Sequence, residues 1–144
     1  MIIGFKVMLR PNNKQSTKMF GTASAARYAY NWTVATQMKH FEDLGLYLSE
    51  SDIRKEFTKH KQEEENKWLY DYSNDATKQS IKDACEAFKS FLAKKKRPGY
   101  EMYSKEQKEK AAKEERILTR YEMQGHPKFK KIKSLPVSIW IQIR

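Results

Sequence analysis

Cysteine is almost absent from this sequence, which has a single cysteine, Cys85, among its 144 residues. One thiol cannot form a disulfide within the chain, and it cannot supply a cysteine-rich zinc site. Long apolar runs are also absent, since none approaches the roughly 18 residues that a membrane-spanning helix needs. The opening MIIGFKVMLRP is not a signal peptide, because Lys6 interrupts its apolar run and no basic region precedes it. We therefore expect a cytoplasmic protein, in a reducing compartment, with no membrane partner.

The residues that usually build active sites are scarce as well. The 5 glycines are scattered, so there is no glycine-rich phosphate loop. His40, His60 and His126 lie far apart, and none has a second histidine at metal-ligand spacing. The acidic runs are mixed with basic residues, as in solvated helical faces, and Cys85 lies on an apolar stripe that favours a core role over a nucleophile. The sequence predicts no catalytic site, no metal and no cofactor, so we expect that this chain is not an enzyme by itself.

Positive charge is what the sequence has in excess. Lysine and arginine number 29 and aspartate and glutamate 18, which gives a formal net charge of +11. A domain this basic usually meets a polyanion, and nucleic acid or an anionic membrane surface are the common ones. The alternative is a basic surface that serves only solubility.

Hydrophobic periodicity predicts strands at both ends and helices between them. Apolar residues alternate with others from Ile3 to Leu9, and again from Val137 to Ile143, which is the period of half-buried strands. Residues 22–44 and 75–96 carry apolar residues at spacings of three and four, typical of helices. Gly45 is a candidate C-cap of the first of these helices, and Ser73 or Asn74 is a candidate N-cap of the second. A shorter helix is expected after Ser49, which with Asp52 approximates a capping box, and another within residues 104–124. The expected fold class is α+β. Because two strands alone do not form a stable sheet, the strands should pair with further strands or a partner.

The expected helix at residues 75–96 carries a stripe of lysines on a face different from its apolar face. A line of cations on one face can follow a phosphate backbone through Coulomb attraction and counterion release. An equally simple alternative is a solubilising surface. The candidate nucleic-acid-binding residues of this helix and its end are Lys78, Gln79, Lys82, Lys89, Lys94, Lys95, Lys96 and Arg97.

A second basic segment, HPKFKKIK, interleaves an aromatic residue with lysines. An aromatic ring can stack on a base or sugar while neighbouring lysines bind phosphates. The candidate residues of this segment are Lys128, Phe129, Lys130, Lys131 and Lys133.

The stretch ARYAYNWTVATQ adds three further candidates. Arg27 and Asn31 are one helical turn apart and share a face. Arginine can form paired hydrogen bonds to phosphate or guanine, and asparagine can do so to adenine. Trp32 lies off the apolar stripe, so it could pack against another element or contact nucleic acid. Tyr30 lies on the stripe, which favours a place in the core.

Several of these motifs occur in one known family in the same order. The chain resembles the front part of the TnpB (OrfB) proteins of insertion sequences. Those proteins begin with a strand and an L-x-P-x-x-x-Q stretch, followed by R-x-x-Y-N-W, A-F-x-x-F and G-x-P-x-F-K motifs. The matching residues are Leu9, Pro11, Gln15, Arg27, Tyr30, Asn31, Trp32, Ala87, Phe88, Phe91, Gly125, Pro127, Phe129 and Lys130. The segment before Gly125 is longer than is usual in the family and looks like an inserted arm.

The resemblance implies a fold and a division of the chain. In the family, a helical recognition bundle is inserted between strands of a small wedge-type β-barrel, of which this chain would hold a part. Residues 1–12 would form the first wedge strand and residues 13–97 the helical recognition domain. Residues 98–125 would be the inserted helical arm, and residues 126–144 the basic loop and the returning wedge strand.

The resemblance also implies a function. TnpB proteins are RNA-guided DNA nucleases related to type V CRISPR effectors, and their front part helps hold guide RNA and target DNA. The start of the helix matching residues 75–96 faces a short target-adjacent motif, which points to Lys78, Gln79 and Lys82. The family's nuclease domain and zinc ribbon lie further along, so the missing nuclease portion or another protein chain is an expected partner. The alternatives are a stand-alone helix-turn-helix DNA-binding protein or transposase remnant, and a helical protein-interaction module.

Overall fold

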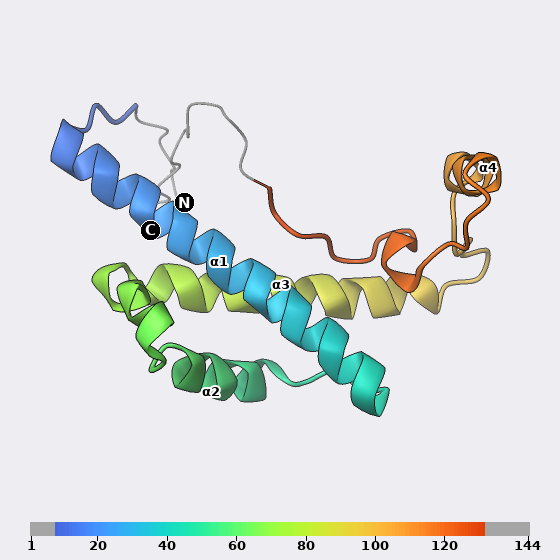
Figure 1. The fold of residues 1–144 in the computed structure, drawn as a ribbon, viewed down its shortest axis with the longest axis horizontal. Coiled ribbons are helices and arrows are strands. Elements are labelled where there is room, and N and C mark those ends of the chain that lie inside the picture. Colours follow the sequence, from blue (N-terminus) through green and yellow to red (C-terminus); the bar gives the residue numbers. More distant parts are fainter. Residues whose placement is uncertain (1–7, 132–144) are drawn as a thin grey trace, which may run out of the picture.

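The computed structural model describes residues 8–131, and these residues form a set of helices joined by short connections (Figure 1). The α-helices are α1 (Asn13–Leu44), α2 (Glu50–His60), α3 (Asn74–Lys95) and α4 (Lys105–Lys113), and the 3₁₀ helices are η1 (Glu64–Asp71) and η2 (Arg120–Glu122).

The predicted α+β class, with a helical bundle inserted in a wedge-type β-barrel, is wrong for this part of the chain. Residues 8–131 contain no strand. Residues 8–12, the end of the predicted first strand, lead irregularly into α1, and residues 126–131 form a loop. A strand is stable only where a neighbouring strand satisfies its backbone groups, and no such neighbour occurs among the described helices. The remainder of both predicted strands lies at residues 1–7 and 132–144, outside the described residues.

Helix α1 is longer than its apolar periodicity predicts. It begins at Asn13 because Asn12 forms a capping box, in which its side chain accepts a hydrogen bond from the Gln15 backbone at 2.9 Å. The Gln15 side chain accepts in return from the Asn12 backbone at 3.0 Å. The helix ends at Gly45, which has a left-handed φ of 69° and donates its N–H to Phe41. The predicted role of Gly45 as C-cap is therefore confirmed.

The starts of α2 and α3 follow the same capping chemistry. The Ser49 hydroxyl accepts from the Asp52 backbone at 3.2 Å, and the Ser73 hydroxyl accepts from the Ala76 backbone at 3.5 Å. Both serines were predicted as caps from sequence, and both are confirmed.

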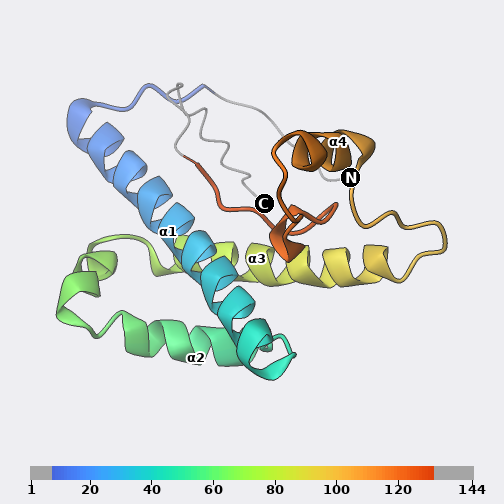
Figure 2. The ribbon, with the colours of Figure 1, turned by 45° about the vertical axis from the view of Figure 1, so that its right-hand side comes forward.

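Helix α1 crosses α3, and α2 packs beside both (Figures 1 and 2). The crossing is close because small side chains line it: Ala25, Ala29 and Ala84 are completely buried. Large apolar residues fill the space around the crossing, and those that are at most 3% exposed are Val34, Ile53, Phe57, Leu69, Ile81, Phe88 and Phe91. Burying such side chains stabilises the fold by about 1.5–3 kcal/mol each.

A buried amide also fixes the connection between α1 and α2. Gln37 is 1% exposed, and its side chain donates to the Leu48 carbonyl at 2.9 Å and accepts from the Leu48 N–H at 2.8 Å. Both polar atoms are therefore satisfied, which removes the cost of burying them. The turn after α1 is held to the helix by this side chain and by His40, whose Nδ1 lies 2.8 Å from the Leu46 carbonyl.

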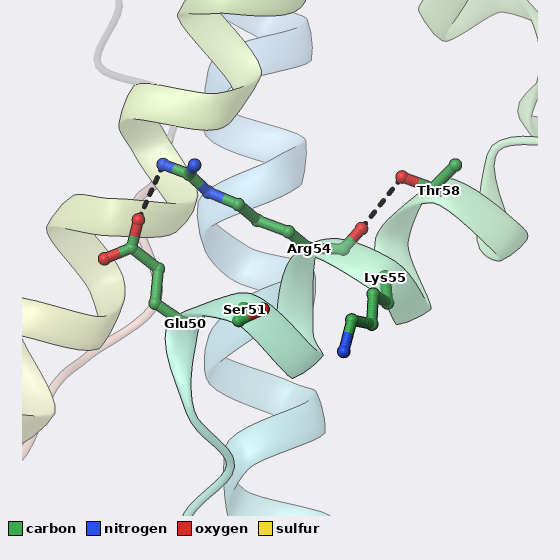
Figure 3. Close-up of a pocket in the computed structure, with 5 residues that line it drawn as sticks. All are labelled: Glu50, Ser51, Arg54, Lys55 and Thr58. Carbon is green, nitrogen blue, oxygen red and sulfur yellow. Dashed lines mark hydrogen bonds and ion pairs between the residues drawn. The ribbon is translucent and has the colours of Figure 1, made fainter.

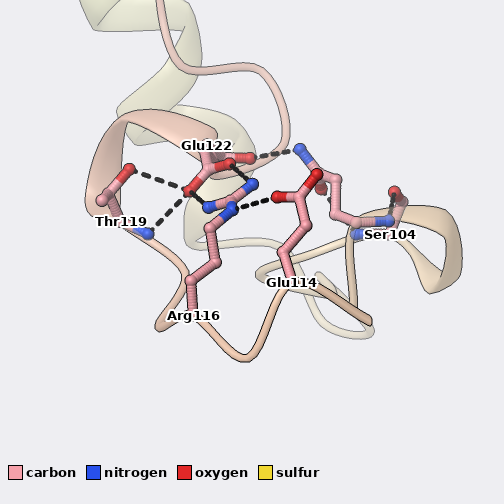
Figure 4. Close-up of polar contacts among 6 residues, drawn as sticks. Ser104, Glu114, Arg116, Thr119 and Glu122 are labelled. Carbon is pink, nitrogen blue, oxygen red and sulfur yellow. Dashed lines mark hydrogen bonds and ion pairs between the residues drawn. The ribbon is translucent and has the colours of Figure 1, made fainter. Parts of the chain in front are cut away.

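The predicted inserted arm, residues 98–125, contains only the short helix α4 and the three-residue 3₁₀ helix η2. Helix α4 ends at Lys113, and Glu115 has a positive φ of 49°, which a helix does not allow. The chain then folds back, and Arg116 forms paired bonds of 2.7 and 2.9 Å to Glu122 (Figure 4). The Arg116 guanidinium is the main cause that lowers the pKa of Glu122 to about 2. The arm is therefore stabilised by its own polar contacts.

Candidate nucleic-acid interface

The predicted lysine stripe lies on the exposed surface of α3. Lys78, Lys82 and Lys89 are all exposed. Lys78 lies 4.0 Å from Asp75, and Lys82 lies 3.8 Å from Glu86. Exposed ion pairs of this length contribute about 0–1 kcal/mol, so a phosphate can replace either carboxylate at little cost.

Gln79 is exposed beside this stripe but already has a partner. Its side-chain amide donates to Asp83 one turn later, at 2.8 Å. The partner is a solvent-exposed carboxylate, so the contact can be exchanged for one to a base or phosphate.

The C-terminal end of α3 gathers further exposed cations. Lys94, Lys95, Lys96 and Arg97 follow one another where the helix ends. Cations at this position are favoured by the partial negative charge of the helix end, which gives them a structural role as well. The Lys94 side chain also runs past Gly125, at the start of the basic loop. The two predicted basic segments therefore meet at this point.

A buried lysine near the start of α3 was missed by sequence reasoning. Lys61 is 7% exposed, donates to the Asn74 side chain at 3.2 Å, and lies 4.6 Å from the centre of the Tyr70 ring. Burial lowers its pKa, and the neighbouring charge of Lys78 lowers it further. No sequence pattern marks this placement, because Lys61 stands in a run of charged residues.

The outer face of α2 forms a shallow polar pocket (Figure 3). Its lining residues are Glu50, Ser51, Arg54, Lys55 and Thr58. Arg54 is paired with Glu50 at 2.6 Å, and Lys55 lies 3.4 Å from Asp52. This pocket therefore presents paired charges, unlike the lysine-rich face of α3.

Trp32 packs between helices in the structure. Its ring lies 5.1 Å from that of Phe57, edge to face, and stacks on His60 at 5.2 Å. His60 is fixed in turn by Tyr28 at 2.8 Å and Glu63 at 3.0 Å. Two roles were predicted for Trp32. The structure provides contacts for one of them, packing between α1 and α2. Arg27 is half-buried on the same helix.

Asn31 contacts the basic loop directly. Its side chain accepts from the Lys130 N–H at 2.7 Å and donates to the Lys130 carbonyl at 3.0 Å. The Lys130 ammonium also lies 4.0 Å from the centre of the Tyr30 ring. The amide edge that could pair with adenine is thus occupied by the protein's own backbone.

His126 anchors the other end of this loop. It is 4% exposed and meets Phe88, Phe91 and Tyr121 edge to face, with ring centres 5.1–5.6 Å apart. Its Nδ1 lies 2.9 Å from the Pro127 carbonyl, and burial lowers its pKa. Sequence reasoning treated His126 only as an isolated histidine, since no local pattern marks its aromatic surroundings.

Between these two anchors and directly after the second, the loop exposes its predicted binding residues. Lys128 and Lys131 are exposed, and Phe129 is 50% exposed. Lys133, the last candidate of this segment, lies outside the described residues. The loop therefore holds a solvent-facing aromatic ring between two lysines.

The described residues hold neither a cluster that could bind a metal ion nor a helix that could span a membrane. Across residues 8–131, no three histidine, cysteine, aspartate or glutamate residues lie close enough to hold a metal ion. The helices in this range are all too short or too polar to cross a membrane. Cys85 is buried, and burial raises the pKa of its thiol.

Two comparisons with known proteins found similarities to this chain. The family model of the helix-turn-helix domain of IS605 OrfB proteins matches residues 1–43. A protein of Escherichia coli (strain K12), named "Putative RNA-guided DNA endonuclease InsQ", is 31% identical over 91 residues. That alignment covers 63% of this chain and 23% of the relative, so the chain spans less than a quarter of the relative's length. The matched residues 1–43 reach almost to the end of α1, and the turn and α2 follow directly.

Proposed function

This chain carries the N-terminal region of TnpB (OrfB) proteins, and from that premise we propose that it is a nucleic-acid-binding module of an RNA-guided DNA endonuclease. The observation that carries this proposal is the exposed lysine stripe of α3, which continues into the cations at the helix end and meets the basic loop beside Gly125. Positive charge placed in this way on a rigid helix suits a phosphate backbone.

The proposed partners are guide RNA and target DNA. Lys78, Gln79 and Lys82 would lie near a short motif beside the target, and the loop lysines would bind phosphates. Guide pairing would read most of the target sequence, so the protein needs mainly backbone contacts and a few base contacts. Residues 13–97 would form the recognition unit, residues 98–125 would be an inserted arm, and the nuclease portion would be the protein partner.

The chemistry of this chain favours binding without cleavage. Phosphodiester cleavage by metal ions needs carboxylates that converge on one point. The acidic residues of α3 instead form single pairs with neighbouring lysines or amides, as Asp83 does with Gln79. We therefore assign the chain a binding role, with catalysis supplied elsewhere.

A titration with labelled nucleic acids tests this function. The chain is mixed with a structured RNA, a DNA duplex and an RNA–DNA hybrid, and affinity is measured by fluorescence anisotropy at low ionic strength. We expect binding to structured RNA or to the hybrid, with every strand intact on a denaturing gel after incubation with Mg²⁺.

The other outcomes distinguish the alternatives. Binding to the DNA duplex alone, in a sequence-dependent manner, would indicate a stand-alone helix-turn-helix protein. Absence of binding to all three would contradict the proposal and favour a helical protein-interaction module. Cleavage by the chain alone would contradict the binding role.

A further inference from the structure

The basic loop is held to the helices at two points, and its two anchors differ in chemistry. At one end His126 is enclosed by aromatic rings of α3 and η2. At the other end the carboxamide of Asn31 bonds both backbone groups of Lys130. The residues between the anchors have exposed side chains apart from Pro127, which is buried.

The contact at Asn31 joins residues far apart in the chain. It pairs positions 99 residues apart, and it engages the donor and the acceptor of the same residue, as a neighbouring β-strand would. Lys130 adds a second contact by placing its ammonium over Tyr30, the residue before Asn31. The loop backbone is thereby fixed in position and in rotation.

A second side chain of the same helix forms the same arrangement. Gln37 bonds both backbone groups of Leu48 and so holds the turn before α2. Gln37 is 1% exposed and acts inside the core, whereas Asn31 is only half-buried and acts beside the predicted binding surface. Helix α1 thus uses carboxamides to hold two irregular segments, one structural and one at the candidate interface.

We propose that Asn31 is a positioning residue for nucleic-acid binding, which orders the loop so that Lys128, Phe129 and Lys131 are presented to a nucleic-acid strand. This inference rests on the proposed function and assigns Asn31 no contact with a base. An ordered loop binds more tightly because the entropic cost of ordering its backbone is met when the protein folds, and no longer opposes binding. Lys130 belongs to the anchor, and its neighbours on both sides provide the contacts.

The first test measures the loop without nucleic acid, using the chain with Asn31→Ala. We expect the amide hydrogen of Lys130 to exchange faster with solvent. We also expect trypsin to cut after Lys128 and Lys130 about tenfold faster, because the variant loses two hydrogen bonds that together favour the ordered loop by roughly tenfold. Asn13→Ala is the matched control, because Asn13 is an exposed asparagine of the same helix. Equal protection in both variants would overturn the anchoring role. Circular dichroism checks that the helices remain folded.

The second test measures binding of a structured RNA at several salt concentrations. Asn31 is neutral, so its removal changes the salt dependence only if charged contacts are lost with it. We expect N31A to weaken binding about tenfold and to reduce the slope of log affinity against log salt by up to about two, one for each loop lysine. In a chain that already carries Lys128→Ala, Phe129→Ala and Lys131→Ala, N31A should have no further effect.

The two tests separate failure of this inference from failure of the proposed function. A weaker N31A with an unchanged salt slope would overturn the positioning role while leaving nucleic-acid binding in place. Absence of RNA binding by the unmodified chain would overturn both the proposed function and the positioning role, even if the first test confirms that Asn31 anchors the loop.

Discussion

Gly21 lies where α1 passes the ring of Tyr72, which follows η1. A Cβ atom added at this position would overlap the Tyr72 ring. Gly21 therefore lets α1 pass close to the Tyr72 ring, which would have to move to admit a Cβ atom. A methyl group here would change the free energy of unfolding in two opposing ways: higher helix propensity would stabilise the fold, and overlap with the Tyr72 ring would destabilise it.

We predict that Gly21→Ala destabilises the fold. In an unobstructed helix this change would stabilise by about 1 kcal/mol, whereas overpacking costs about 1–3 kcal/mol. The free energy of unfolding, measured by urea denaturation, should therefore fall. In a chain that carries Tyr72→Ala the ring is absent, and the same glycine substitution should stabilise. Stabilisation in both backgrounds would contradict the packing at Tyr72.

Single residues were predictable from sequence where local rules determine them. Ser49 and Ser73 as N-caps and Gly45 as C-cap follow from backbone chemistry within one turn. Asn31 and His126 could not be placed, because their partners lie far away in the chain. Asn31 was a candidate for a base contact, and in the structure its amide bonds the backbone of Lys130.

At the scale of elements, the attachment of the basic loop to α3 depends on a histidine that can gain charge. Burial is the main reason that the pKa of His126 lies below its ordinary value, and the nearby charge of Arg120 lowers it further, while the bond to Pro127 raises it. The neutral ring is therefore the form that the aromatic surroundings accept.

We predict that acidification weakens this attachment. Because the folded state holds His126 at a lowered pKa, the unfolded chain takes up the proton first, and stability falls as the pH drops below about 6.5. Urea denaturation at pH 7.5 and 5.5 should show a loss of stability. His126→Phe keeps an aromatic ring and cannot be protonated, so its loss should be smaller. An equal pH dependence in both proteins would show that His126 is not the group responsible.

The helices themselves were largely predictable, with errors at their ends. The apolar stripe and caps of α3 predicted a helix at residues 75–96, and the structure has Asn74–Lys95. The start of α1 was missed because its first turns are exposed and carry no apolar stripe, although Asn12 caps them. The arm was expected to be helical over residues 104–124, whereas α4 ends at Lys113 and the chain after it is held by the pair between Arg116 and Glu122.

At the scale of the whole molecule, the core and the candidate binding surface occupy different faces of the same helix. The face of α3 that meets α1 and α2 is apolar, and its lysine stripe is exposed. The fold therefore does not depend on the stripe, and the stripe can be altered without disturbing the core. The fold class was not predictable in the same way, because two alternating segments suggested a sheet and the described residues 8–131 contain only helices and loops.

The resemblance to OrfB proteins was the part of the whole that sequence motifs predicted best. Ordered motifs along the chain carried it, and the family model that matches residues 1–43 supports it. Such motifs show which residues recur together, but they do not predict which other residues those side chains contact. Trp32 and Asn31 belong to one motif, yet in the structure one packs against α2 and the other holds the basic loop.

The salt dependence of RNA binding after neutralising the α3 stripe tests the central claim most directly. The triple variant Lys78→Ala, Lys82→Ala and Lys89→Ala is compared with a control of equal charge, Lys105→Ala, Lys108→Ala and Lys110→Ala on α4. If α3 contacts the nucleic acid, the stripe variant loses affinity, and its slope of log affinity against log salt falls by about two to three. The affinity and the slope of the control variant stay close to those of the unmodified chain. Equal slopes for the two variants would contradict the account, because the positive charge would then act only through the net charge of the molecule.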